Sequence, residues 1–251
     1  MNSFFLWNQK ISNRIKKIFP HTNYNIFKDY NQIIGKYFGL AASDSRKVIL
    51  DIGGGKSCHF QKEDFRKDAY VVAMDVSAEE LALNRHADRK IQADATKELP
   101  FPKELEKPCI VCSECVMEHL ENNASFVELS AEVIAPGGYF IALMPNKFAP
   151  FAVLNQMLGE KFGKKVLSFF GKLKAHNGFK AYYHKTYPSA LKRLLKANGY
   201  RIVEQKFSYS SSAYFDVCFP VYFLSSLYES IVKLFRAKNL CGYFIIVAQK
   251  E

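Results

Sequence analysis

The chain has 251 residues, of which 49% are hydrophobic and 24% charged, a balance that is ordinary for a globular protein and excludes wholesale disorder. The net charge of +11 is held entirely by residues 161–206, which carry 12 basic residues and one acid, Glu204. No apolar run reaches the roughly 18 residues of a membrane span, and residues 1–19 lack the apolar core and cleavage site of a signal peptide, so we expect a cytoplasmic protein with reduced cysteines.

Short β-branched runs alternate with helical stretches over the first half of the chain. We predict helices from near Ser77, with acidic residues in its first turn, and over 122–134, where a Pro-Gly-Gly sequence closes the helix. Predicted strands cover 47–51, 70–75, 90–93, 109–113 and 139–144. Strands that are apolar on both faces and alternate with helices are typical of a parallel sheet covered on both sides.

The second half of the chain predicts a helix over 188–197 and strands over 200–207 and 241–248. The expected fold class is therefore α/β, a Rossmann-like seven-stranded, mostly parallel sheet with helices on both faces plus helical insertions. We expect the domain over 41–251, with substrate-side insertions at 147–187 and 209–238. Residues 1–40 read as an N-terminal helical lid, because apolar residues recur there at helical spacing; a helix lying on an anionic membrane is the alternative.

The most informative segment is Val48–Gly55, where an apolar strand runs into three glycines. Glycine lets the backbone approach a ligand closely, and such a turn after a first strand is a usual place for a nucleotide-like ligand. The dinucleotide fingerprint fails because its third glycine position holds Cys58, and the leading glycine of a phosphate-binding P-loop is missing. Asp51 would repel a phosphate but tolerate a cationic sulfonium or ammonium group.

The D-x-G-x-G pattern of Asp51, Gly53 and Gly55 resembles the signature of class I S-adenosylmethionine-dependent methyltransferases. The resemblance covers roughly residues 45–207, and it extends to Glu118-His119-Leu120 and to residues 136–138 and 144–146. Two positions depart from the family pattern: Ser57 stands where a third glycine is frequent, and Cys109 where an aspartate usually opens the fourth strand. The first departure alters the loop slightly, and the second removes a charge that is not expected to touch the cofactor.

The resemblance implies S-adenosyl-L-methionine as the cofactor and assigns residues to its parts. Asp75, 20 residues beyond Gly55, would bind the ribose hydroxyls, and Asp94 the adenine amino group. The glycines and Ser113 would line the methionine end. The full set of expected cofactor-binding residues is Asp51, Gly53, Gly54, Gly55, Asp75, Val76, Asp94, Ala95 and Ser113. For each aspartate a purely structural role, as a turn or helix-cap residue, is the alternative.

Three residues are candidates for catalysis. His119 follows the fourth predicted strand, at the rim where a substrate would meet the cofactor, and histidine is the side chain that most often serves as a general base. His184 is a second candidate base, and Tyr183 would gate or hydrogen-bond a substrate. The alternative for either histidine is a structural side chain satisfied by its neighbours.

The spacing of Cys109, Cys112 and Cys115 invites a metal site, since thiolates at such intervals hold zinc or iron–sulfur clusters. A structural zinc needs a fourth ligand, and an interval of three places Cys109 and Cys112 on opposite faces of a strand. Free cysteine also packs well in cores. We therefore expect no metal.

Together these features predict methyl transfer to a small-molecule, sugar or glycan-precursor, or lipid-like acceptor, with O-methylation as the leading expectation. The rivals are a catalytically inactive methyltransferase fold that serves as a binding or scaffold protein, and a nicotinamide-dependent oxidoreductase, which the missing glycine disfavours. Residues 161–206 form a solvated surface or attract an acidic substrate or a membrane surface. No nucleic acid is expected as a partner, because no known nucleic-acid module accompanies the charge.

Overall fold

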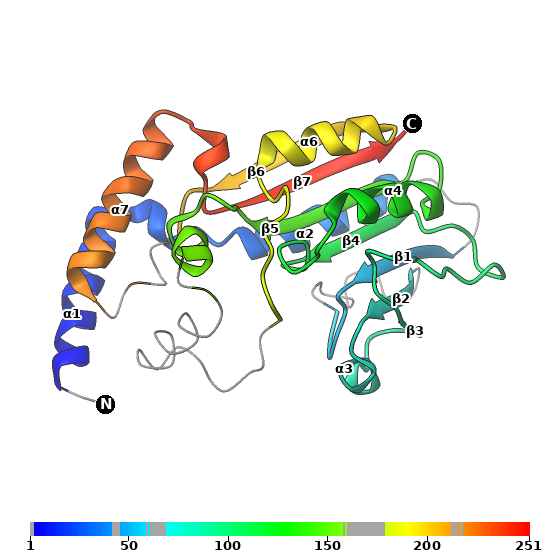
Figure 1. The fold of residues 1–251 in the computed structure, drawn as a ribbon, viewed down its shortest axis with the longest axis horizontal. Helices are drawn as coiled ribbons and strands as arrows, with labels where there is room; N and C mark the ends of the chain where they lie inside the picture. The colour runs from blue at the N-terminus through cyan, green and yellow to red at the C-terminus, as the bar shows by residue number, and fades with distance from the viewer. Residues whose placement is uncertain are drawn as a thin grey trace. The chain divides into compact units, whose positions relative to one another are not determined.

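The computed structural model describes residues 3–41, 46–58, 60, 69–157, 159, 179–211, 215 and 218–251 (Figure 1). The chain divides into two compact units. Unit 1 consists of Met1–Ile26, Pro145–Ala181 and Phe207–Phe244, and unit 2 of Phe27–Met144, Tyr182–Lys206 and Ile245–Glu251. Each unit is described by itself below.

A seven-stranded sheet forms the framework of the fold, in the order β3-β2-β1-β4-β5-β7-β6. The strands are β1 (Lys47–Ile52), β2 (Ala69–Asp75), β3 (Arg89–Gln92), β4 (Ile110–Glu114), β5 (Tyr139–Pro145), β6 (Tyr200–Ser208) and β7 (Tyr243–Lys250). The pairs β1–β2, β1–β4, β2–β3 and β4–β5 are parallel. β1 lies in the middle of these pairs and is almost wholly buried, as its apolar run of residues 48–50 predicts.

β7 runs against its neighbours, as the backbone hydrogen bonds at its two ends show. Near its end, Lys250 bonds with Gly137 and Gly138 just before β5, whereas Gly242 before its start accepts from Asn146 just after β5. The same reversal holds toward β6, because Gly242 N–H donates to Ser208, the last residue of that strand. The sheet is therefore parallel except for β7. The predicted fold class, a mostly parallel Rossmann-like sheet, is confirmed by this strand order and these strand directions.

Helices of unit 2 cover both faces of the sheet: α2 (Ile26–Leu40), α3 (Ala78–Leu83), α4 (Asn123–Val133) and α6 (Pro188–Ala197). The rings of Tyr139 and Phe140 show the two faces, because successive side chains on β5 point to opposite sides. Tyr139 packs on Tyr37 of α2, and Phe140 packs on Phe126 of α4. α6 packs against α4, and α3 against β2 and β3.

Sequence signals for helix ends explain where α3 and α4 begin. The Ser77 side chain accepts a hydrogen bond from Glu80 N–H at the start of α3, and Asn122 accepts from Ala124 and Ser125 N–H at the start of α4. The predicted helix over 188–197 has the bounds of α6. Because helices that follow strands of a parallel sheet run back along it, the N-terminal ends of α3, α4 and α6 lie at the carboxyl edge of the strands.

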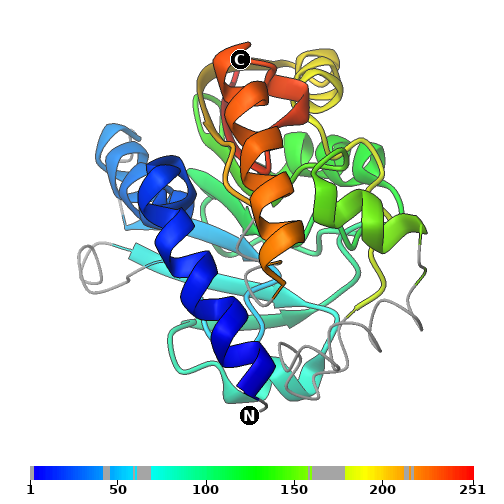
Figure 2. The same cartoon turned by 90° about the vertical axis from the view of Figure 1, so that its left-hand side faces the viewer.

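Unit 1 contains α1 (Ser3–Ile18), η1 (Pro20–Asn23), α7 (Phe219–Leu234) and η4 (Lys238–Leu240). α1 packs against α7, and both views show the two helices side by side (Figures 1 and 2). Asn8 of α1 accepts a hydrogen bond from Phe219 N–H at the start of α7. The N-terminal segment of this unit is therefore tied to a helix more than 200 residues away in sequence.

Parts of two predicted segments lie outside the described residues. These are residues 158 and 160–178 of the predicted insertion at 147–187, and 212–214 and 216–217 of the one at 209–238. The predicted N-terminal lid over 1–40 contains α1, in unit 1, and α2, nearly all of which belongs to unit 2. Among the described residues, no helix has both the length and the apolar character to cross a membrane.

Candidate cofactor and catalytic site

The three glycines after β1, here called the glycine loop (residues 53–55), turn sharply beside the end of β2. Gly53 has φ +76° and Gly55 φ +29°, a left-handed backbone region that favours glycine. Gly53 and Gly54 both donate their N–H groups to Met74 O, at 2.7 and 3.3 Å. A Cβ on Gly53 would come within 2.2 Å of Val116 Cγ2, and one on Gly54 within 2.9 Å of Ala73 Cβ. The loop is therefore packed so closely against its neighbours that it requires these glycines.

Asp75 closes β2 next to the glycine loop, as predicted. One carboxylate oxygen accepts from Gly55 N–H at 3.1 Å and the other from Ser77 N–H at 2.9 Å. The carboxylate thus joins the loop to the start of α3, and the helix-cap role considered from sequence is part of its function. Because the side chain is only half-buried, its oxygens are still available to two hydroxyls of a ligand.

Asn84, which follows α3, is a residue that the sequence reasoning missed. Its amide nitrogen donates to Gly54 O at 2.8 Å, and its amide oxygen accepts from His86 and Ala87 N–H at 2.9 and 3.1 Å. The side chain is 2% exposed. It therefore holds the glycine loop at Gly54, whereas Asp75 holds it at Gly55. The signal in the sequence was slight: a lone asparagine where a helix ends.

Asp51 lies beneath the glycine loop and is completely buried. Cys112 Sγ on the neighbouring strand β4 lies 3.7 Å from one of its oxygens. Tyr30 of α2 is also completely buried; burial, followed by the nearby Cys112, Asp51 and Glu114, raises its pKa well above the usual value. α2 thus contributes a hydroxyl to the underside of the site, a contact that sequence spacing did not reveal.

Asp94 lies just after β3, whose last residue, Gln92, is opposite Asp75 in the register. Its carboxylate accepts from Thr96 N–H and Oγ1 at 3.0 and 2.7 Å and pairs with Lys97 Nζ at 3.2 Å. The Thr96 hydroxyl is the main cause that lowers the Asp94 pKa. Asp94 therefore organises the turn after β3 at the edge of the site, and the structure shows no contact between it and the glycine loop.

Two further predicted cofactor residues flank this edge and agree with a nucleoside ligand. Val76, next to Asp75, is 47% exposed, an unusual setting for a branched apolar side chain at the end of a buried strand. Ser113, on β4 beside Ile52, is 1% exposed, and its hydroxyl has no hydrogen-bond partner among the described residues. An apolar surface beside a carboxylate, with a buried unsatisfied hydroxyl on the next strand, fits a nucleoside with a polar tail. Ala95, by contrast, is buried.

The turn after β4 carries the candidate base. His119 is 32% exposed, and its Nε2 lies 3.9 Å from Oε1 of Glu118. The Glu118 side chain is 95% removed from solvent, its second oxygen has no hydrogen-bond partner among the described residues, and burial raises its pKa to about 8. Glu118, expected only as part of a family tripeptide, is thus a buried carboxyl beside an accessible imidazole.

Tyr183 and His184 lie in a second turn that packs against this first one. Tyr182 and Tyr183 donate their N–H groups to Glu118 O at 2.7 and 3.0 Å, and Tyr183 and Lys185 have positive φ values of 51° and 57°. His184 Nδ1 accepts from Asn123 N–H at 3.2 Å, at the first turn of α4. The structure therefore brings all three candidates to one region, where His184 caps a helix and Tyr183 is buried at 4% exposure.

The three cysteines considered as metal ligands are occupied in other ways. Cys109 Sγ donates to Val48 O, and burial raises the pKa of its thiol to about 11. Burial also raises the pKa of Cys112 and of Cys115 well above the usual value. High pKa values keep the three thiols protonated at neutral pH; Cys109 and Cys112 are core residues, and Cys115 is partly exposed. Among the described residues, no group of three or more histidines, cysteines or acids is arranged to hold a metal ion.

Replacing Gly53 with alanine should destabilise the protein by roughly 1–3 kcal/mol, because the new Cβ meets Val116 and the residue keeps a left-handed backbone. Urea unfolding measures the loss. The double variant Gly53→Ala/Val116→Ala removes the atom closest to the new Cβ and should recover part of the lost free energy of unfolding. The Gly137→Ala variant measures the cost of the positive φ alone, because a Cβ there meets no atom within 4 Å. Equal losses in Gly53→Ala and Gly137→Ala would show that packing against Val116 contributes nothing.

The comparison with known proteins covers the region that carries the site. Residues 50–142, from β1 into β5, match the family model described as a methyltransferase domain. The matched region includes the glycine loop, Asp75, Asp94, Ser113 and His119. The resemblance to methyltransferases read from the sequence is confirmed over these residues. No curated protein matches the chain.

Solved structures show the same fold at low sequence identity. A S-adenosylmethionine-dependent methyltransferase from Mesorhizobium loti has a TM-score of 0.51 at 15% identity, over 86% of this chain and 96% of that one. Geranyl diphosphate C-methyltransferase from Streptomyces coelicolor A3(2) has a TM-score of 0.54 at 11% identity, over 86% and 79%. Phosphoethanolamine N-methyltransferase 2 from Haemonchus contortus has a TM-score of 0.52 at 15% identity, over 88% of this chain; the chain spans only 52% of that protein.

Proposed function

Residues 50–142 match a methyltransferase domain, and we propose that the chain is a class I S-adenosylmethionine-dependent methyltransferase that transfers the methyl group to a hydroxyl of a small molecule of the sugar or glycan-precursor class. The observation that carries the proposal is the pair formed by His119 and the buried Glu118. A hydroxyl must lose its proton as it attacks, so it needs a base, whereas a neutral amine attacks with its own lone pair. An imidazole backed by a carboxyl is suited to the first task.

Separate groups of residues would bind the cofactor and accept the proton of the acceptor. The cofactor, when bound, supplies an electrophilic methyl group on a positively charged sulfur. The glycine loop and Ser113 would hold its methionine end, Asp75 the ribose, and Asp94 with Val76 and Ala95 the adenine. His119 takes the proton of the acceptor hydroxyl, and Glu118, when it is ionised, stabilises the resulting imidazolium from 3.9 Å. Because His119 is one-third exposed, the proton then leaves to solvent. Most of the acceleration comes from positioning.

His184 suits a supporting role better than that of a base. Its Nδ1 already accepts a backbone hydrogen bond, so the neutral ring carries its proton on Nε2 and can only donate there. The amide of Asn123 also donates to His184 O at 2.6 Å and to Met117 O at 2.8 Å. We assign His184 and Tyr183 to holding the second turn against the first, which fixes the position of His119.

A cleft beyond the second turn favours an acceptor that carries an anionic group. The cleft has a volume of about 260 Å³ and is lined by Lys185, Tyr187, Ala190, Arg193 and Leu194. It lies at the start of α6, hence at the same edge of the sheet as the glycine loop. Two exposed cations and no acid line it, so a phosphate or carboxylate of the acceptor would be attracted there. That segments 147–187 and 209–238 contribute to acceptor choice stays a prediction.

The His119→Ala variant should bind S-adenosylmethionine as tightly as the wild type by calorimetry, while turnover falls by about 100-fold or more. The reaction is followed with a panel of sugars, each offered with and without a phosphate. His86→Ala, whose backbone rather than its ring takes part in the bond to Asn84, is the matched control and should turn over normally. Undiminished turnover in His119→Ala would remove it as the base. Cofactor binding without turnover across the panel would favour the scaffold alternative.

A further inference from the structure

α7 of unit 1 is amphipathic, but its polar face is buried and its apolar face is exposed to solvent. Four of the five buried side chains on this helix are polar or carry a hydroxyl, namely Tyr222, Ser225, Ser226 and Glu229; the fifth is Val232. Its exposed side chains are large and apolar: Val221 (43%), Phe223 (40%), Leu224 (63%), Leu227 (41%), Ile231 (48%) and Leu234 (78%). A surface helix normally shows the opposite arrangement. Intervals of three and four place most of these apolar residues along one side, here called the apolar stripe.

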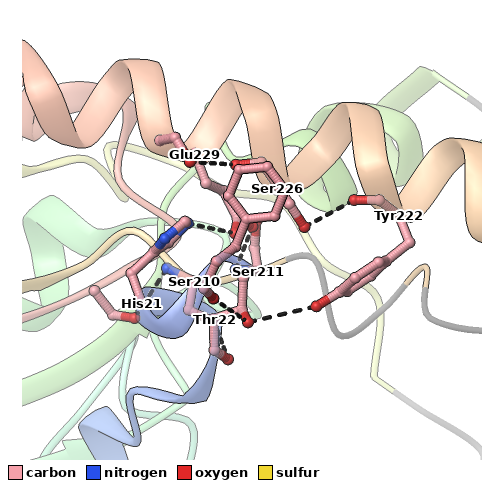
Figure 3. A network of polar contacts seen from close by, with 10 residues as sticks. His21, Thr22, Ser210, Ser211, Tyr222, Ser226 and Glu229 are labelled. Atoms are coloured by element: carbon pink, nitrogen blue, oxygen red, sulfur yellow. Dashed lines mark hydrogen bonds and ion pairs between the residues drawn. The ribbon is translucent and has the colours of Figure 1, made fainter. Parts of the chain in front are cut away.

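The buried polar face is held by specific partners, so the orientation of the helix is determined. Figure 3 shows the carboxylate of Glu229 next to Ser211 and His21. Its Oε1 accepts from Ser211 N–H at 2.6 Å and from Ser211 Oγ at 2.9 Å, and its Oε2 lies 3.6 Å from His21 Nε2. The Tyr222 hydroxyl donates to Thr22 Oγ1 at 3.4 Å. Rotating the helix to bury the apolar stripe would break every one of these contacts and expose or orphan a buried carboxylate.

The charge around the apolar stripe has a single sign. Among the described residues of unit 1, Glu229 is the only acid, and it is 1% exposed. Exposed cations lie on α1, which packs against α7, in the last turn of α7 and in the segment that follows it. They are Lys10, Arg14, Lys17, Lys233, Arg236 and Lys238. The surface of this helix pair therefore combines a ridge of apolar side chains with basic residues and presents no negative charge.

We propose that unit 1 docks on an anionic membrane surface through the apolar stripe of α7, with the cations of α1 and of the segment after α7 meeting the lipid phosphates. Aliphatic and aromatic side chains between cations are what an interfacial helix uses to enter the headgroup region. Trp7, exposed on α1 at 58%, is a residue type that prefers the membrane interface. A second copy of the chain fits less well, because the exposed charged side chains that the structure describes in this unit are all cations, and two such surfaces repel each other. The inference is independent of which acceptor the enzyme methylates.

The experiment uses the full chain and two kinds of vesicle, phosphatidylcholine alone and phosphatidylcholine mixed with phosphatidylglycerol. Co-sedimentation measures binding, and Trp7, the only tryptophan of the chain, reports insertion by a shift of its emission to shorter wavelength. The wild type should bind the anionic vesicles and lose binding in high salt. The Leu224→Ser/Leu234→Ser variant should bind about tenfold more weakly or worse, and Lys10→Glu/Arg14→Glu should weaken binding as well.

The matched control is Leu40→Ser/Leu83→Ser, which changes two leucines of unit 2 that are 60% and 61% exposed. It removes the same apolar area elsewhere and should bind vesicles like the wild type. All four leucines are exposed, so the variants should fold. Equal binding to both kinds of vesicle, or undiminished binding of Leu224→Ser/Leu234→Ser, would overturn the proposal. So would a dimer in sedimentation velocity that only this variant abolishes, because the apolar stripe would then be covered by a second copy.

Discussion

Replacing Asp75 with alanine should lower the affinity for S-adenosylmethionine by about 100-fold or more, enough to abolish a calorimetric signal at ordinary concentrations. The carboxylate is expected to accept two ribose hydroxyls, and hydrogen bonds to a charged group contribute roughly 1.5–3 kcal/mol each. The same carboxylate holds Gly55 N–H and Ser77 N–H in the structure. Its loss therefore also loosens the glycine loop against the start of α3.

Two variants separate these effects. Asp75→Asn keeps an oxygen for the backbone N–H groups but loses the charge, so it should retain the fold and bind the cofactor at an intermediate affinity. Glu104→Ala, which removes an exposed carboxylate 2.9 Å from Arg89 in the same unit, should bind like the wild type. If Asp75→Ala bound the cofactor normally, the ribose would have to be held elsewhere and the assignment of the whole site would fail.

The sequence revealed the parts of the site whose chemistry is local. A run such as Val48–Gly55 combines a buried strand with a turn that only glycine can form, and both properties are visible in the residues themselves. Asp75 and Ser113 were found because Asp75 closes β2 and Ser113 lies one residue before the end of β4, and parallel strands end at one edge of a sheet. The register confirms this arrangement, with Ile52 beside Ser113 on one side and Met74 on the other.

The contacts that sequence reasoning missed join segments far apart in the chain. Asn84 reaches Gly54 across 30 residues, and Asn123 contacts His184 across 61. Tyr30 reaches the underside of Asp51 only because α2 packs on the sheet. Such pairs depend on how elements pack, and a single polar residue in a turn gives no sign of its partner. The reversed faces of α7 were also missed, because the helical spacing of apolar residues does not say which face is buried.

Glu118 provides the second large expected effect, a change of stability with pH. Its pKa is about 8 in the folded chain, against a usual value of 4.5, because burial disfavours the charged form. Between these two pH values the folded chain keeps a proton that the unfolded chain releases, so the free energy of unfolding falls as the pH rises through this window. The loss grows by about 1.4 kcal/mol for each pH unit in the window, and amounts to several kcal/mol once the pH exceeds 8.

The Glu118→Gln variant cannot ionise and should therefore escape this loss. Urea unfolding should show the variant and the wild type to be similarly stable near the lower end of the window, and the variant to be more stable by several kcal/mol at about pH 9. Glu132→Gln, which changes an exposed carboxylate on α4, is the control and should show no such gain.

The turnover rate of the wild type, unlike its stability, should rise with pH in this range. An ionised Glu118 stabilises the His119 imidazolium, so the wild type should gain activity through pH 8, and Glu118→Gln should not. A variant that is no more stable than the wild type at alkaline pH would mean that Glu118 ionises normally, and the buried carboxyl would then have no part in tuning the base.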